Sequence, residues 1–189
     1  MSNFVERGFN MINRIIDEIN SVLDQNLYFS ALALSLVLID SCAKAEFPTE
    51  KHNNVRYKHW YKKYIGDRIF DANGLPNIDE DVAYSLRCCF LHEGNPNVES
   101  KYGIDKFELM FQEKNPLPDV EEIDETTTVF NVKYFDVFGI DNKTGDKFYK
   151  INVRSYCEHI CECVSSYYKD NKGKFLFNYS IINWEDITL

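Results

Sequence analysis

The stretch 27–46, LYFSALALSLVLIDSCAKAE, decides the fold that this sequence predicts. Apolar side chains occur all round the helix that it would form, so other helices must cover it on most sides. The uncharged run 25–39 has 15 residues, fewer than the roughly 20 that a membrane-spanning helix requires. Asp40 follows this run, and we therefore predict a buried core helix and no membrane association.

Helical periodicity in the flanking segments predicts a bundle of about four helices in roughly the first hundred residues. Apolar residues recur at three- and four-residue steps over 3–25, which indicates an amphipathic helix. A further helix is expected over 50–65, with Thr49 as its N-cap. Another is expected over 79–93, closed by Gly94.

The second half of the chain has a different composition. Residues 113–127 are acidic and contain prolines, which indicates a solvated loop. Alternating apolar and polar residues around the turn 142–145 predict a β-hairpin. A helix over 154–170 and a last strand within 174–182 should follow, and 107–111 is a further candidate strand.

The predicted fold class is therefore mainly α. We expect a helical bundle over residues 1–112, an acidic loop over 113–127 and an α+β extension over 128–189. The extension would consist of the β-hairpin, the helix and the last strand, packed on or beside the bundle.

Composition and charge exclude several classes of protein. Hydrophobic residues make up 44% of the chain, too many for a disordered protein. The net charge of −9 excludes a uniformly basic nucleic-acid coat. The N-terminal segment has acids and bases spaced through it, unlike a signal peptide, so we expect the six cysteines to be free thiols in a reducing cytoplasm.

The segment 84–96, YSLRCCFLHEGNP, places Arg87 and His92 in an otherwise apolar helix. On an ideal helix these two side chains point about 140° apart, whereas Ser85 shares the polar stripe of His92. A shared role would therefore require Arg87 to reach along the helix, the last turn to unwind, or two chains of a dimer to share a ligand.

A purely structural role for this pair is the alternative. A buried arginine requires a counter-charge, and Asp40, the only acid in LSLVLIDSCA, has the matching requirement. An Arg87–Asp40 pair would satisfy both, and His92 would then be a favourable cation near a helix C-terminus. Residue chemistry leaves both interpretations open, because perturbed, paired groups also mark functional sites.

The string YSLRCCFLHEG resembles the Arg-x4-6-His motif of the HEPN superfamily, in the wording of bacterial HEPN-like proteins. The resemblance covers roughly residues 1–100 and implies a dimer in which the motifs of both protomers line one cleft. Many members are metal-independent endoribonucleases, often toxins or anti-phage proteins, and others are non-catalytic binding modules. Active members often carry Asn, Asp or His directly after the arginine, and this chain has Cys88 there.

The chemistry of the motif suits RNA cleavage. Attack by a ribose 2′-hydroxyl needs a group that moves a proton and a cation that meets the charge growing on the phosphate. Histidine is suited to the first task near neutral pH, and the arginine fork is suited to the second. His92 and Arg87 would take these roles without a metal or another cofactor.

The segment VRYKHWYKKY, 55–64, is a second candidate for RNA contact. Its cations could hold phosphates while its aromatic residues stack on bases. The alternative, which we favour, is an amphipathic helix with its aromatic side chains inside and a solvated basic face. If RNA binds, the best candidates for its backbone contacts are Arg56, Lys58, Lys62 and Lys63.

The segment CEHICEC, 157–163, contains the residue types that bind zinc. On a helix, however, Cys157 and Cys161 share one face while His159 and Cys163 lie nearly opposite. No second ligand cluster completes a four-coordinate site, so we expect no metal.

Two functions follow from the sequence. The first is an RNA-binding, HEPN-type endoribonuclease of the cytoplasm, a homodimer with catalytic Arg87 and His92 and an antitoxin or other protein partner. The second is a non-catalytic HEPN-like interaction module, in which Arg87 pairs with Asp40. In both, Asp40, Ser85 and Cys88 would support the motif structurally.

Overall fold

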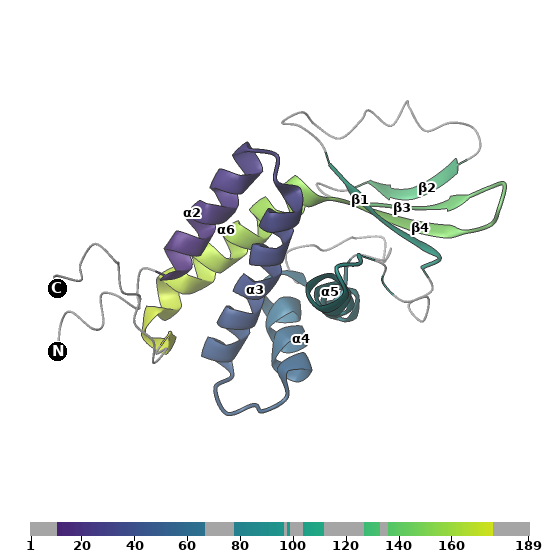
Figure 1. Cartoon of the computed structure of the whole chain (residues 1–189). Helices are drawn as coiled ribbons and strands as arrows, with labels where there is room; N and C mark the ends of the chain where they lie inside the picture. Colours follow the sequence, from purple (N-terminus) through teal and green to yellow (C-terminus); the bar gives the residue numbers. More distant parts are fainter. Residues whose placement is uncertain are drawn as a thin grey trace.

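The computed structural model describes residues 11–66, 78–96, 98, 104–111, 127–132 and 136–175. The fold is mainly helical, with a small mixed sheet to one side of the helices (Figure 1). The described helices are α2 (Met11–Asp24), α3 (Tyr28–Glu46), α4 (Asn53–Tyr64), α5 (Glu80–Cys88) with the π-helical turn η2 (Cys89–Glu93), α6 (Val153–Asn171) and the short 3-10 helix η5 (Lys172–Lys174).

The helix α3 lies in the middle of the helical layer, in contact with α2, α4 and α6. Its Leu32, Leu36 and Ile39 have no exposed surface, so the prediction of a central core helix is confirmed. By length and composition alone α3 could cross a membrane. Its burial among the other helices accounts for the same apolar composition.

In the part of the chain that the structure describes, four strands form the sheet, in the order β1-β4-β3-β2. The strands are β1 (Lys106–Met110), β2 (Thr127–Val132), β3 (Asp136–Asp141) and β4 (Lys147–Asn152). β3 and β4 form the expected hairpin, in which Gly145 has a φ of 77°, a conformation that glycine adopts without strain. β1 confirms the candidate strand near 107–111 and pairs with β4 in parallel.

The helix α6 follows β4 without a loop and returns to the bundle, against α2 and α3. The Asn152 side chain accepts a hydrogen bond from the Ser155 amide and so caps its first turn. Arg154, which is 8% exposed, donates to the Leu23 carbonyl and to Asn26 Oδ1 at the end of α2. One hydrophobic core therefore contains residues from both sides of the expected boundary at residue 112.

Some helix ends differ from the prediction, and some predicted elements lie outside the described residues. α4 begins after His52, which makes no side-chain cap, so the Thr49 cap is wrong. α5 begins after Asp79, whose side chain accepts from the amides of Asp81 and Val82, as an N-cap should. Residues 3–10 of the first helix, 113–126 of the acidic loop predicted over 113–127, and the last strand beyond Phe175 are outside the described residues. Thr127, the last residue of that predicted loop, begins β2.

Glu46, at the C-terminal end of α3, joins three helices and η5. Its carboxylate accepts hydrogen bonds from Lys63, Tyr64, Tyr167 and Lys174. Burial alone would raise the pKa of Glu46, but these four donors outweigh it and lower the pKa from 4.5 to about 2. The contacts therefore stabilise the ionised form of Glu46 in the folded protein.

We predict that Glu46 makes the fold sensitive to acid. Because its pKa is lowered in the folded state, its contribution is complete above the unfolded value of 4.5 and is lost as the pH falls towards 2. The shift corresponds to roughly 3 kcal/mol at neutral pH. Glu46→Gln should lower the thermal midpoint at pH 7 and flatten its decline on acidification, measured by circular dichroism.

The matched control is Glu18→Gln. Glu18 forms an exposed pair with Arg14 on α2, and such pairs contribute little to stability. If the two variants lose thermal stability in parallel with wild type between pH 5 and pH 2, the Glu46 contacts do not carry the acid sensitivity.

Candidate functional site

Arg87 on α5 forms an ion pair with Asp40 on α3. Its Nε donates to Asp40 Oδ2 at 2.9 Å, and its Nη2 lies 2.9 Å from the same oxygen. The side chains are only 15% and 18% exposed, so each charge neutralises the other away from bulk water. The structure thus contains the pair that the structural interpretation of the motif expects.

His92 also contacts Arg87, through a widened helical turn. Residues Cys89–Glu93 form a π-helical turn, and the Gly94 amide donates to the carbonyls of Cys89 and Phe90. Bonding between residues five apart brings side chains with that spacing closer together than an α-helix does. Nη1 of Arg87 consequently lies 2.8 Å from His92 Nε2.

This contact corrects the expectation drawn from an ideal helix. Arg87 and His92 do not need two chains to meet, because the last turn departs from α-helical geometry in the way a joint role would require. Gly94 ends the turn with a φ of 64°, a left-handed conformation that favours glycine. The predicted helix end at Gly94 is therefore confirmed, while the regular α-helix up to Glu93 is not.

The contact between Arg87 and His92 also identifies the tautomer of the imidazole. A guanidinium group only donates hydrogen bonds, so His92 Nε2 must accept the bond and the ring proton must be on Nδ1. A doubly protonated ring could not accept from Arg87. In this arrangement His92 is therefore neutral, and its side chain is exposed at the surface.

Arg87 remains a cation in this site. Burial lowers its pKa, but the Asp40 carboxylate and the neighbouring Cys88 raise it by more, and the net direction is upward. Three of its N–H groups point to Asp40 and His92. Of the five that a guanidinium carries, two remain for Cys88 or for a ligand.

Cys88 and Tyr84 lie beside the arginine on α5. Burial raises the pKa of Tyr84, and a hydrogen bond with the Cys88 thiol raises it further. Cys88 is half-buried with a free thiol. Ser85 is buried on the same helix, and the described contacts of Asp40, Arg87 and His92 do not include it.

The basic residues of α4 mostly contact acidic side chains. Lys58 pairs with Asp81, Lys62 with Glu80 and Lys63 with Glu46. Arg56 donates to the Glu50 carbonyl. Binding of RNA by these four residues stays a prediction, and phosphates would have to compete with the acidic partners of the three lysines.

Most aromatic residues of α4 lie inside the protein, and Tyr64 is half-buried. Tyr57, Trp60 and Tyr61 have no exposed surface, so they cannot stack on bases. This agrees with the amphipathic interpretation of α4, in which its aromatic side chains belong to the core.

Among the described residues, no three His, Cys, Asp or Glu side chains gather as metal ligands. His159 and Cys163 share one face of α6, with Nε2 and Sγ 3.6 Å apart. Cys157 and Cys161 are buried, and burial raises the pKa of both thiols to about 12. Both therefore stay protonated near neutral pH, unlike the thiolates that bind zinc.

The site combines a fixed cation with a neutral imidazole on an exposed turn. Such a pair can bind a phosphate group and accept or donate a proton. Sequence reasoning identified Asp40, Arg87 and His92 but missed Tyr84, whose place three residues before Arg87 on one helix is the signal that could have identified it.

No family model, curated protein or solved structure matches the chain.

We predict that the Asp40–Arg87 pair stabilises the fold. Asp40→Ala should lower the free energy of unfolding by about 2 kcal/mol, because it leaves a mostly buried cation without its partner. The double variant Asp40→Ala/Arg87→Met removes both charges and should recover part of the loss, which urea unfolding would measure as a coupling energy. The control is Asp17→Ala, which removes an exposed carboxylate on α2.

Purely additive effects of Asp40→Ala and Arg87→Met would show that the two side chains do not interact in solution.

Proposed function

We propose that the protein is a HEPN-type, metal-independent endoribonuclease of the cytoplasm with Arg87 and His92 as catalytic residues. The observation that supports this most is the 2.8 Å contact between Arg87 Nη1 and His92 Nε2 across a π-helical turn. Widened turns of this kind are rare and often occur at functional sites. The Arg-x4-His wording of the turn resembles the motif of that superfamily.

The mechanism starts from the contact between Arg87 and His92. An RNA phosphate that binds the guanidinium would draw Nη1 away from the imidazole and free the lone pair of Nε2. His92 Nε2 then accepts the proton of the ribose 2′-hydroxyl, and the 2′-oxygen attacks phosphorus. The bond between phosphorus and the 5′-oxygen breaks, and the 5′-oxygen takes a proton from water, which leaves a 2′,3′-cyclic phosphate and a 5′-hydroxyl end. His92 then returns its extra proton to the solvent.

Asp40 would act by positioning Arg87 for this step. Two N–H groups of Arg87 point to Asp40 Oδ2, which fixes the plane of the guanidinium before the substrate arrives. Preorganised donors of this kind stabilise charge that develops on a phosphate without rearranging during the reaction.

A homodimer is part of this proposal. The resemblance implies a cleft between two protomers, and two exposed apolar side chains of α3 lie on the face that carries Asp40. Phe29 is 57% exposed, with its ring against Phe90 and Phe111, and Val37 is 41% exposed. Their spacings to Asp40 fit one face of a helix, and a second protomer would cover them, with an antitoxin or another protein as a second candidate occupant.

The second candidate function is a non-catalytic HEPN-like interaction module. The Arg87–Asp40 pair favours it, because this pair alone satisfies the buried arginine. Cys88 favours it as well, since active members often have a polar residue at that position. In this case His92 serves only as a partner of Arg87 and as a polar residue close to the helix end.

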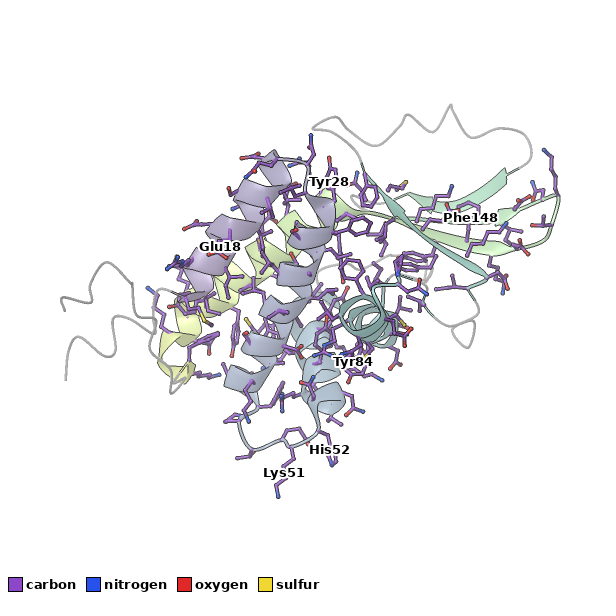
Figure 2. All side chains as sticks on the ribbon, viewed as in Figure 1. Glu18, Tyr28, Lys51, His52, Tyr84 and Phe148 are labelled. Atoms are coloured by element: carbon purple, nitrogen blue, oxygen red, sulfur yellow. The ribbon has the colours of Figure 1, made fainter. Side chains whose placement is uncertain are left out.

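An RNA cleavage assay separates the two functions. Purified protein with a chelator should cut single-stranded RNA and leave cyclic phosphate ends, and His92→Ala and Arg87→Ala should each lower the rate at least about 100-fold. His52→Ala is the matched control, because His52 is exposed at the turn between α3 and α4 (Figure 2), outside the motif on α5 and η2. Equal cleavage by wild type and His92→Ala would falsify the proposed mechanism.

Mixing the two variants tests whether each site uses residues of one chain. The structure pairs Arg87 and His92 within one protomer, so dimers of an Arg87→Ala chain and a His92→Ala chain would contain no intact pair. We expect such mixtures, refolded together, to stay inactive. Recovery of cleavage would instead show that Arg87 of one protomer acts with His92 of the other.

A further inference from the structure

Several buried polar atoms have no hydrogen-bond partner among the described residues, and two of them lie on neighbouring helices beside the Arg87 site. They are Oδ1 of Asp40, whose other oxygen holds Arg87, and the hydroxyl of Tyr57 on α4. Buried polar groups in native proteins are nearly always bonded to protein or to ordered water. The chemistry of the two atoms is complementary, because a carboxylate oxygen only accepts whereas a tyrosine hydroxyl can donate.

Tyr57 has no exposed surface, and α4, which carries it, packs against both α3 and α5, the helices of the ion pair. Its ring packs edge-on against Tyr84 with 5.4 Å between ring centroids, and Tyr84 precedes Arg87 on α5 by three residues. Burial raises the pKa of Tyr57, Tyr156 and Asp40 raise it further, and Arg87 lowers it by less. The hydroxyl therefore keeps its proton near neutral pH and can donate a hydrogen bond.

We propose that Tyr57 is a positioning residue, whose hydroxyl donates to Asp40 Oδ1 through one buried water. The two atoms make no direct hydrogen bond, and a water is the usual bridge between polar groups at a greater separation. The result is a chain of hydrogen bonds from Tyr57 through Asp40 and Arg87 to His92. The effect of Tyr57 on catalysis rests on the proposed function, whereas the chain of hydrogen bonds does not depend on it.

Tyr57 would act by preventing rotation of the Asp40 carboxylate. With Oδ1 bonded towards Tyr57 and Oδ2 bonded to Arg87, both oxygens have fixed directions. The guanidinium plane then also has a fixed direction, and with it the N–H that reaches His92 Nε2. Loss of the Tyr57 hydroxyl should therefore loosen the contact between Arg87 and His92 while leaving the aromatic core in place.

Tyr61 provides a matched control for Tyr57. It lies one turn further along α4, is equally buried, and its ring stacks on that of Tyr57 with 6.5 Å between centroids. Its hydroxyl instead receives a hydrogen bond from Tyr156 at 3.3 Å. Tyr61→Phe removes the same atom from the same core without affecting Asp40.

The first measurement is nitrogen NMR of the histidine rings, which separates the two imidazole tautomers. In wild type we expect His92 in the form with the proton on Nδ1. Tyr57→Phe should lower the fraction of this form, and Tyr61→Phe should not. In the cleavage assay, Tyr57→Phe should lower kcat roughly tenfold with little change in KM, because the guanidinium that meets the developing charge on the phosphate is then less well oriented.

The second measurement is a high-resolution crystal structure of the wild-type protein, which decides the matter even if Tyr57→Phe does not fold. Density for a water between the Tyr57 hydroxyl and Asp40 Oδ1 supports the proposal. If no water lies between these two atoms and they do not contact each other, the proposal is overturned. Equal NMR effects of Tyr57→Phe and Tyr61→Phe, or none from Tyr57→Phe, also overturn it. If the tautomer responds as expected but wild type cuts no RNA, Tyr57 positions the ion pair and only the nuclease function fails.

Discussion

The ion pair between Asp40 and Arg87 is the constraint on which the site depends. α3 is apolar on most of its surface because it lies between other helices, and a carboxylate there is costly without a cation. Arg87 supplies that cation from α5, and the pairing orients its guanidinium. The position of Nη1 and the neutral tautomer of His92 both follow from this orientation.

The parts that sequence reasoning predicted are those set by local or pairwise chemistry. All-round apolarity identified α3 as the central helix, and Gly94 identified a helix end that needs a left-handed residue. The matching requirements of Arg87 and Asp40 identified an ion pair between residues 47 positions apart in the chain. In each case a single physical requirement could be met by only one segment or residue of the sequence that we considered.

The parts that could not be predicted depend on how the elements meet in space. Nothing inside RCCFLH marks a π-helical turn, since it contains neither proline nor glycine and its apolar residues fit an ordinary helix. The parallel pairing of β1 with β4 joins strands far apart in sequence, which a hairpin pattern does not reveal. The carboxylates that neutralise the lysines of α4 likewise come from α3 and α5.

The return of α6 to the bundle affects how the protein is made. α6 covers α2 and α3 and sends Arg154 to the end of α2, yet it is synthesised long after the helices that carry Asp40, Arg87 and His92. Before α6 emerges from the ribosome, the apolar surface of α2 and α3 lacks its cover, and contacts between such distant segments form slowly. A nascent or truncated chain that lacks α6 therefore contains the whole motif without the packing that α6 gives to α3, the helix that carries Asp40.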